Sequence, residues 1–539
     1  MDSQLPVTLI SVSAAFLPIL VLLLLLVWRG WSTSSAAPVA LALAVGVAMV
    51  VFQTPLHTVA VATGKGLWDA AFILYIVWPA LILYHIANGA NAFDAIRQGI
   101  LRLIPDRLLV VLVFAWVLTS FIQSIAGFGA PLAVVSPILL GLGVRPVYAV
   151  LLPIIGGAWA NSFGSLGAPW LALSSVVDIP DPTQTLQFSA ALVWIANLTG
   201  GLMIAWLYGG LWALRRGLPA IVIISALQGG GLMLLLPRVL PIAMLISCAA
   251  ALVAVLVLSR WRFYRQQDAD EPNALFATPH IPGPSTDTAP AKMSLLAAFA
   301  PYIFLGVVAV AVLTITPLRA VLEGLRLGLP FAQTSTGYDL QTAAVDAYAA
   351  FTPLTHPGTF LLLAALFGYA LFKRRDHYPP DTGLARVLGR AANDAVPVTF
   401  SIAALMVMSA VMSHSGEITV LALGLSAVAG PTVYLAAANF IALVGSLTTS
   451  SNTASNVLFG PLQVTGATAE GLPVSIVLGA QAAGAAVGSA VSPADALLGA
   501  TTVGKPALVG AVLQRAIPWA LATGLLISAL TIGLAALAR

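Results

Sequence analysis

Residues 120–137 read "SFIQSIAGFGAPLAVVSP" and place three helix breakers, Gly127, Gly129 and Pro131, inside a long apolar run. Such a run predicts a continuous helix, in which each glycine costs about 1 kcal/mol relative to alanine and a proline about 3 kcal/mol. A break leaves backbone N–H and C=O groups unpaired, and these groups are then free to act as ligands. The stretch therefore predicts an interrupted helix whose break serves a function.

The composition fixes the class of protein. The chain has 539 residues, of which 60% are hydrophobic and only 8% are charged. Runs of about 20 apolar residues recur, the length that crosses a hydrocarbon core about 30 Å thick. The sequence predicts an all-α polytopic membrane protein with about 12–14 transmembrane segments. The expected spans are 6–28, 36–53, 67–88, 107–125, 147–160, 186–214, 219–236, 238–258, 295–317, 358–372, 394–413, 432–447, 474–491 and 507–537.

Two polar interruptions divide the chain. Residues 259–294 are rich in proline, acids and small polar residues, which predicts a flexible cytoplasmic linker. It separates an N-terminal membrane half (1–258) from a C-terminal half (295–539). The second interruption, 318–357, is expected to contain its own helix or a partly re-entrant piece.

The basic residues predict the orientation. If the N-terminus is external, fifteen of the 23 Lys and Arg fall on one side, which the positive-inside rule makes cytoplasmic. They then anchor the topology in the membrane and indicate no nucleic-acid partner. The fifteen are Arg29, Arg97, Arg102, Arg107, Arg215, Arg216, Arg260, Arg262, Arg265, Lys292, Lys373, Arg374, Arg375, Arg386 and Arg390.

Four stretches rich in breakers and hydroxyls lie at membrane depth, one pair in each half. They are "QSIAGFGAP" (123–131), "ANSFGSLGAP" (160–169), "GSLTTSSNTASN" (445–456) and "GSAVSPADA" (488–496). Freed backbone groups at such depth must be buried in protein or line a wet cavity. Small residues also serve plain helix packing in membranes, but paired broken helices in two halves are typical of a transporter's midplane site. We predict two repeats with broken helices or re-entrant hairpins, related by inversion if residues 417–429, 13 residues long, do not cross the membrane.

At these motifs the chain resembles the bacterial lactate permease family of secondary transporters. "FIQSIAGFGAP" (121–131) is similar to the family's F-L-E-G-A-A-G-F-G-A-P, "SFGSLGAP" (162–169) to A-F-G-A-M-G-I-P, and "SSNTASNVLF" (450–459) to G-S-D-T-S-S-N-A-L-F. The resemblance runs from about residue 67 onward and implies a location in the bacterial cytoplasmic (inner) membrane. It implies symport of small 2-hydroxymonocarboxylates such as lactate and glycolate, driven by protons, in a fold of inverted repeats with hairpin tips.

The chain departs from the family where charge is concerned. Gln123 replaces a glutamate, Asn452 an aspartate and His85 a lysine. The two lost carboxylates are natural proton carriers, so the coupling group must be sought elsewhere. Asp495 is the only carboxylate in the four motifs, and a desolvated carboxylate can bind and release protons. Ser451-Asn452-Thr453 also resembles a hairpin-tip motif of sodium-coupled carboxylate symporters, so a sodium-coupled organic anion symporter remains the alternative.

We therefore expect a monocarboxylate symporter, with an anion channel as a further rival. We expect no enzyme, because neither His-Glu-x-x-His nor Gly-x-Ser-x-Gly occurs, and no cofactor, metal or catalytic residue is predicted. Partners are the substrate anion, H+ or Na+ and the lipid bilayer; the oligomeric state stays open, a homodimer included. Asp495 is the expected ion-coupling residue, and the expected substrate-binding residues are Gln123, Ser124, Gly127, Phe128, Gly129, Ala130, Asn161, Ser162, Gly164, Ser450, Ser451, Asn452, Thr453, Ser455 and Asn456.

Overall fold

The computed structural model describes residues 5–127, 129–265, 275–276, 293–379 and 383–538. In these ranges ten helices are long and apolar enough to cross a membrane, or up to eleven when the bent pair Pro146–Asn161 and Gly164–Val176 is taken as one span. One of the ten is a 77-residue run, Pro182–Leu258. At 1.5 Å per residue such a run is about 115 Å long, far more than one crossing needs. The predicted class, a polytopic α-helical membrane protein, is confirmed.

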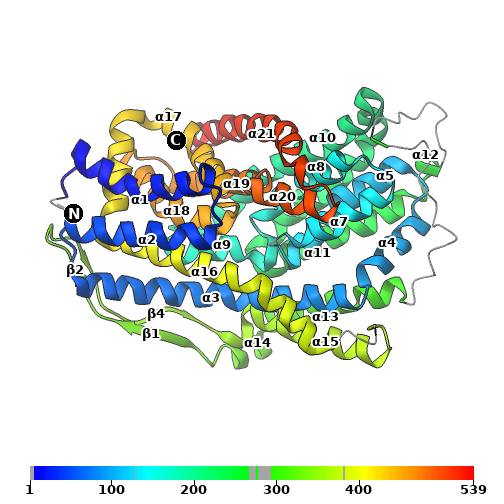
Figure 1. Ribbon diagram of the computed structural model, residues 1–539, viewed down its shortest axis with the longest axis horizontal. Helices are drawn as coiled ribbons and strands as arrows, with labels where there is room; N and C mark the ends of the chain where they lie inside the picture. Colours follow the sequence, from blue (N-terminus) through cyan, green and yellow to red (C-terminus); the bar gives the residue numbers. More distant parts are fainter. Residues whose placement is uncertain (1–4, 128, 266–274, 277–292, 380–382, 539) are drawn as a thin grey trace.

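Four long helices from the two halves of the chain lie side by side along the long axis (Figure 1). α16 packs against both α2 and α3, and α1 packs against α2. A 2.8 Å contact between His85 Nε2 and Asp394 Oδ2 joins α3 to α16. Segments from before and after residues 259–294 therefore interleave. These helices are α1 (Leu9–Val27), α2 (Thr33–Val50), α3 (Leu56–Gly89) and α16 (Leu384–Ser415).

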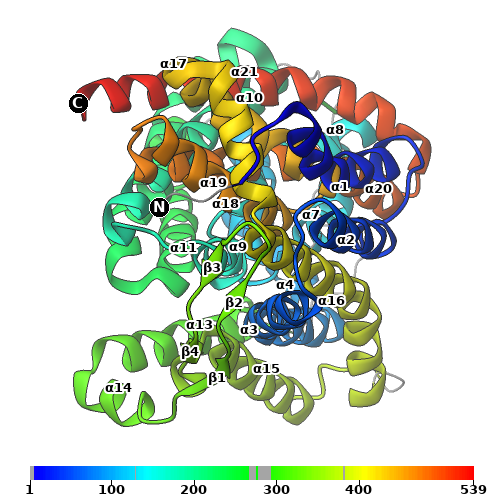
Figure 2. The ribbon, with the colours of Figure 1, turned by 90° about the vertical axis from the view of Figure 1, so that its left-hand side faces the viewer.

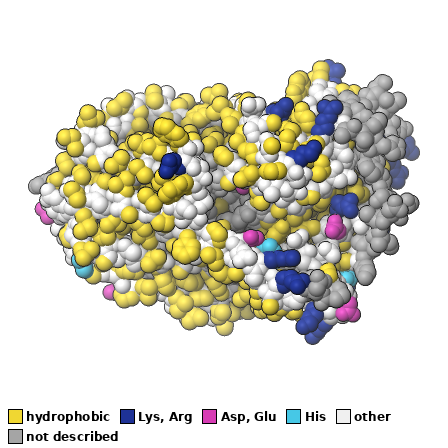
Figure 3. Space-filling model, in the orientation of Figure 1, with side chains coloured by type: hydrophobic (Ala, Val, Ile, Leu, Met, Phe, Trp, Pro, Cys, Tyr) yellow, Lys and Arg dark blue, Asp and Glu magenta, His cyan; other side chains and the backbone are white. Residues whose placement is uncertain are grey.

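The far end of the long axis carries short helices and most of the visible positive charge. Figure 3 shows Lys and Arg side chains gathered there, over the region of α4 (Ala92–Leu103), α5 (Arg107–Leu112) and α12 (Arg262–Arg265). Asp106 caps α5 by accepting a hydrogen bond from Leu109 N at 2.9 Å. Its other oxygen accepts from Arg216 Nη2, also at 2.9 Å, and both side chains are largely buried.

The first two motifs form a helical hairpin and a broken helix. The hairpin's first arm is α5, the π-helical turn η1 (Val113–Leu118) and α6 (Thr119–Ile125), and its second arm is α7 (Ala130–Gly141). The broken helix is α8 (Pro146–Gly157), the 3-10 turn η2 (Ala158–Asn161) and α9 (Gly164–Val176). Glycine allows the positive φ of +85° at Gly129, where the hairpin turns.

The last two motifs repeat this arrangement. The second hairpin is α17 (Glu417–Thr449) followed by α18 (Asn452–Ala469), and the second broken helix is α19 (Val474–Ala490) followed by α20 (Pro493–Thr502). α17 is itself interrupted at Gly430, which has a φ of +64°. The segment 417–429 is thus a separate straight piece, continuous with the hairpin arm only through that bend.

The two units, each a hairpin with its broken helix, pack against each other reciprocally. Each hairpin packs against the first half of its own broken helix, α7 on α8 and α18 on α19. α18 also packs against α9, and α7 packs against α20, so each hairpin contacts the far half of the other unit's broken helix. The reciprocal contacts bring both hairpin tips and both breaks to the centre of the molecule.

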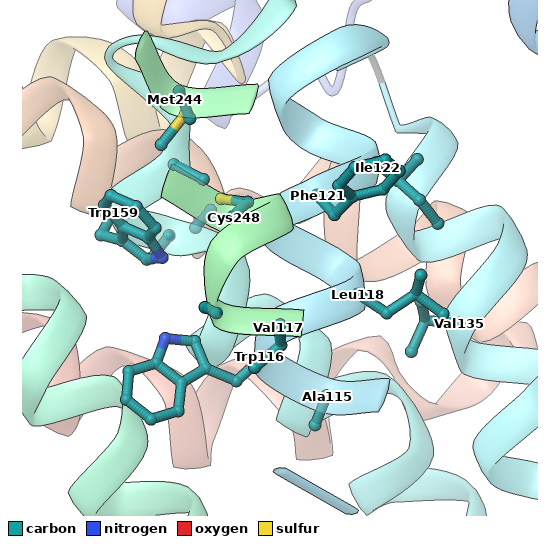
Figure 4. Close-up of a cluster of buried hydrophobic side chains, with 14 of the residues drawn as sticks. Ala115, Trp116, Val117, Leu118, Phe121, Ile122, Val135, Trp159, Met244 and Cys248 are labelled. Atoms are coloured by element: carbon teal, nitrogen blue, oxygen red, sulfur yellow. The ribbon is translucent and has the colours of Figure 1, made fainter. Parts of the chain in front are cut away.

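The remaining long helices surround this centre. Cys248 of α11 lies among Trp159, Phe121 and neighbouring side chains in a mostly apolar cluster (Figure 4), where its Sγ accepts from Gln228 Nε2 at 3.9 Å. The indole of Trp159 donates to Ser120 Oγ at 2.9 Å, so its one polar group is satisfied. The surrounding elements are α10 (Pro182–Ser225), η3 (Ala226–Gly230), α11 (Gly231–Leu258), α13 (Leu295–Thr314), α15 (Pro357–Arg374), η5 (Pro506–Leu508) and α21 (Val509–Leu537).

The interruption at 318–357 contains a short helix and two small hairpins of strands. α14 (Thr316–Leu322) agrees with the expected helix, whereas the strands were not predicted. β1 (Leu327–Phe331) pairs antiparallel with β4 (Val345–Phe351), and β2 (Thr334–Ser335) with β3 (Gln341–Thr342); η4 (Pro353–Thr355) then leads into α15. They cover one end of α3, where Tyr348 Oη donates to Asp69 Oδ2 at 2.9 Å. Burial and this carboxylate raise the pKa of Tyr348.

The predicted linker, 259–294, and the α1–α2 turn both contact the central helices. Most of 259–294 falls outside the described residues, but Leu275 O accepts from Arg145 N at 2.8 Å, so this part of the predicted linker contacts the α7–α8 turn. The α1–α2 turn does not lie at the basic end, where Arg29 was expected. Thr33 Oγ1 donates to Thr449 O at 2.9 Å, which holds this turn against the second hairpin tip.

Candidate functional site

Residues from all four motifs line one central cavity. Its volume is about 90 Å³, and its wall includes Gln123, Gly127 and Gly129 from the first motif and Asn161 and Ser165 from the second. The third motif contributes Ser450, Ser451, Asn452 and Thr453, and the fourth Ser489, Ala490 and Asp495. A water molecule needs about 10–15 Å³ of such space, so the cavity has room for roughly six to nine water-sized groups.

Side-chain amides join the two units across this cavity. Gln123 Nε2 donates to Asn161 Oδ1 at 2.7 Å, and Asn161 Nδ2 donates to Ser489 Oγ at 2.9 Å and to Ala486 O at 3.1 Å. The first hairpin, the first broken helix and the second broken helix are thereby connected in one chain of hydrogen bonds. An amide serves here because it donates and accepts at once, which a carboxylate at position 123 does only when protonated.

The backbone at the first broken helix is strained and is held by a hydroxyl. Ser165, Leu166 and Gly167 have φ values of +49°, +53° and +83°, so three successive residues are left-handed. Only glycine adopts this region at little cost, so surrounding contacts must hold the other two. One such contact is Ser165 Oγ, which accepts from Gly127 N at 2.9 Å and ties this turn to the first hairpin tip.

The second hairpin tip is built by serines. Ser450 has a φ of +55°, which ends α17, and Ser451 Oγ accepts from Ala454 N at 3.1 Å, which caps α18. Asn452 Nδ2 donates to Ser162 Oγ at 3.3 Å. Asn452 Oδ1 is buried without a hydrogen-bond partner among the described residues. An unpaired buried acceptor is costly, so this oxygen is available to a donor that enters the cavity.

The site's positive potential comes from backbone. No Lys or Arg occurs among the described residues that line the cavity, but α7 and α18 both begin at it, with Gly129 and Ser451 as their N-cap residues. The first N–H groups of a helix lack partners inside it and carry roughly half a positive charge. Two such ends at one cavity form a suitable environment for a single anionic group.

Asp495 is the one carboxylate among the described lining residues. It lies in the first turn of α20, whose N-cap Ser492 Oγ accepts from Asp495 N at 3.3 Å. It also borders a second cavity beside the first, on the other side of the tip Ser450–Thr453. The side chain thus stands between two spaces.

Several predicted site residues support the cavity without lining it. Ser124 Oγ donates within its own helix to Phe121 O, and Ala130 is buried. Ser162 Oγ donates to Ala482 O at 2.6 Å and Gly164 packs against Gln123, while Ser455 Oγ donates to Ala442 O and Asn456 Nδ2 to Pro169 O. These groups fix the hairpins in place. Phe128 lies outside the described residues.

Other lining residues were not predicted, among them Thr119, Pro153 and Gly157. Gln481, buried in α19, is a further group that the motifs do not include; its Nε2 reaches Ser455 O at 3.2 Å and Asn456 Oδ1 at 3.3 Å. A proline, a glycine or a single amide in an apolar run is a weak signal alone. The one signal in the sequence was that an amide such as that of Gln481 is costly at membrane depth unless it is used.

Comparison with known proteins identifies the family. The sequence matches the L-lactate permease family over residues 11–538. The chain belongs to the L-lactate permease family. It is 26% identical over 529 residues to the L-lactate permease of Escherichia coli strain K12, covering 91% of this chain and 89% of that protein. It is 25% identical to the glycolate permease GlcA of the same strain, covering 90% and 88%.

Among solved structures, this permease is similar to the YdaH transporter of Alcanivorax borkumensis, with a TM-score of 0.41 and 13% identity over 86% of this chain and 84% of that one. It is also similar to MtrF of Neisseria gonorrhoeae, with a TM-score of 0.43 and 14% identity over 88% and 82%. Family membership makes the chain a transporter and excludes an enzyme, as the sequence predicted.

Proposed function

We propose that this permease is a proton-coupled symporter of small 2-hydroxymonocarboxylates of the lactate and glycolate type. The observation that carries the proposal is the convergence of all four motifs on one small cavity where α7 and α18 begin. Lactate has six non-hydrogen atoms and glycolate five, which suits room for roughly six to nine water-sized groups.

The chemistry of the wall suits a hydroxy acid. The carboxylate would accept from the backbone N–H groups at the start of α18 and from the hydroxyls of Ser450 and Ser451. The 2-hydroxyl would donate to Asn452 Oδ1, which has no partner among the described residues. Since only one anionic group can use this environment, a dicarboxylate leaves its second charge without compensation.

The position of Asp495 supports proton coupling. A substrate carboxylate in the cavity lies near a second carboxylate, and two like charges in one small space repel each other. A proton bound to Asp495 removes the repulsion, so substrate and proton bind together better than either alone. Gln123 cannot take this role, because its amide is neutral and is already bonded to Asn161.

We further propose that the two hairpin units are inverted repeats, that the N-terminus is external and that the protein lies in the inner membrane. The reciprocal packing of α7 on α20 and α18 on α9 supports the repeats. The gathering of basic side chains at the end opposite the N-terminus supports the orientation (Figures 1 and 3).

The test is transport of labelled lactate by proteoliposomes. An inward proton gradient should drive accumulation in the wild type, and Asp495→Asn should abolish the gradient's effect while exchange of internal for external lactate stays measurable. Exchange needs no net proton movement, so the two assays separate binding from coupling. Glu323→Gln, beside the exposed helix α14, is the matched control. Gradient-driven uptake by Asp495→Asn would refute the role of Asp495.

Three other results would redirect the assignment. Uptake that requires sodium would favour the tip Ser451–Thr453 as a cation site. Uptake that never exceeds electrochemical equilibrium would indicate a channel. Succinate or citrate outcompeting lactate would refute the substrate class.

A further inference from the structure

A second cavity adjoins the central one. Its volume is about 300 Å³, and it shares Gly129, Ser450, Ser451, Thr453 and Asp495 with the central cavity. The tip of the second hairpin is thus a partition with a cavity on each side. A group bound at the tip hydroxyls can reach into either space.

The second cavity has one polar end and one apolar wall. Hydroxyl groups from the tip face those of the α1–α2 turn, where Ser32, Thr33 and Ser34 line the cavity. The rest of the lining is mainly aliphatic, apart from Ser401 and Asp495, and comes from three helices, with Ile402, Leu405 and Met406 of α16, Val457 of α18 and Leu498 of α20. This polarity matches a ligand with a small polar head and an apolar tail.

Most of the apolar wall is hidden from solvent. Ile402 is 6% exposed, Leu405 2% and Val457 1%, so these side chains offer little surface to water, and a tail placed against them gains mainly from its own removal from water. Burial of each methylene then strengthens binding by about three- to fourfold. Lactate, with a single methyl group, cannot use this wall when its carboxylate lies at the tip.

We propose that the second cavity receives the side chain of longer 2-hydroxymonocarboxylates, whose carboxylate binds at the tip Ser450–Thr453 and whose alkyl chain lies against Ile402, Leu405 and Val457. The inference rests on the proposed function and extends the substrate class from lactate to aliphatic 2-hydroxy acids of up to about six carbons. Ser32, Thr33 and Ser34 then contact the polar end of the ligand from the α1–α2 turn.

The experiment measures competition with lactate in exchange. Proteoliposomes with equal pH on both sides are given labelled lactate and an unlabelled series, from lactate through 2-hydroxybutanoate to 2-hydroxyhexanoate. Apparent affinity should rise about three- to fourfold per methylene, which is tens-fold across the series. A flat or falling series would overturn the inference while leaving lactate transport, and thus the proposed function, intact.

Two substitutions on α16 localise the effect. Ile402→Trp fills the cavity and should abolish the dependence on chain length. Val396→Trp makes the same replacement on the same helix at a side chain that is 43% exposed and does not line the cavity, so the dependence should remain. The quantity compared is the ratio of long-acid to lactate affinity within each variant, so a general loss of rate cancels. Equal ratios in the two variants would overturn the inference.

Hexan-1-ol and direct binding complete the test. If hexan-1-ol competes as well as 2-hydroxyhexanoate, the cavity binds apolar chains such as lipid tails, and the assignment to carboxylates is overturned. If wild-type vesicles exchange none of the acids, the proposed function fails. Thermal stabilisation of the purified protein that rises with chain length and is lost in Ile402→Trp would then still support the ligand class, and stabilisation independent of chain length would overturn it.

Discussion

The close contact between α17 and α19 offers a direct test of the helix packing. Gly484 and Gly488 lie one helical turn apart on α19 and face the backbone of α17. A Cβ atom at Gly484 would lie 2.0 Å from Asn439 O, and one at Gly488 would lie 2.1 Å from Leu443 O. Real Cβ contacts are essentially never under 3.0 Å. A methyl group at either position therefore forces the helices apart by about 1 Å, because small residues set the distance of such packing.

We predict that Gly488→Ala destabilises the protein by about 1–3 kcal/mol, the usual cost of overpacking a close contact. The obstacle is backbone, so no rotamer change relieves it, and the gain of about 1 kcal/mol in helix propensity does not compensate. One increase in the distance between α17 and α19 accommodates both methyl groups. The double variant Gly484→Ala/Gly488→Ala should therefore lose less stability than the sum of the losses of the two single variants. Transport should fall as well, because α17 ends at Ser450 and α19 carries Ser489 on opposite sides of the cavity.

The assay is thermal unfolding of the purified protein, followed by tryptophan fluorescence, together with lactate exchange. Gly533→Ala in α21 is the matched control, since no atom lies within 4 Å of the point that its Cβ would occupy and alanine favours the helix. It should melt at or slightly above the wild-type temperature. If Gly488→Ala has the same melting temperature as Gly533→Ala and exchanges lactate at the wild-type rate, the close approach of α17 and α19 is wrong.

Three further predictions concern other parts of the molecule. Gly129→Leu should abolish exchange while the protein still inserts and purifies, because a side chain there is strained at φ +85° and meets Leu498; normal exchange would place the site elsewhere. Asp106→Ala should lower the free energy of unfolding by about 3–5 kcal/mol, because it removes the α5 cap and the buried carboxylate that pairs with Arg216. Glu323→Ala, in an exposed ion pair, should lower it by under about 1 kcal/mol. Equal melting temperatures of the two variants would contradict this. Burial lowers the pKa of His356 from 6.5 to about 4, so as the pH falls the unfolded chain takes up a proton before the folded protein does. The free energy of unfolding should therefore fall, by at most about 3 kcal/mol, between pH 6.5 and pH 4. His356→Asn should reduce the dependence of the melting temperature on pH over that range, and an unchanged dependence would exclude this histidine.

The sequence alone determined the class of protein and the position of the breaks. An apolar fraction of 60% with 8% charge permits only a chain that buries its surface in lipid, and hydropathy runs locate helices because every backbone group must be paired there. The breaks at Gly129 and Ser450 were predictable because glycine, proline and clustered hydroxyls at membrane depth are costly unless they are used. The family match, over residues 11–538, includes all four motifs.

Tertiary structure decided which of these groups meet. The motifs gave no reason to pair Gln123 with Asn161, to send Ser162 to Ala482 O, or to hold Ser124 within its own helix. Such pairings depend on how the helices rotate and cross. Adjacent polar residues such as Gln123 and Ser124 look alike in sequence, although successive side chains on a helix point in different directions and only Gln123 lines the cavity. The α1–α2 turn shows the same limit. Arg29 was expected among the cytoplasmic basic residues, but Thr33 of the same turn binds the backbone of Thr449 beside the cavities. Distant packing, and not local composition, sets where a polar turn finds its partners.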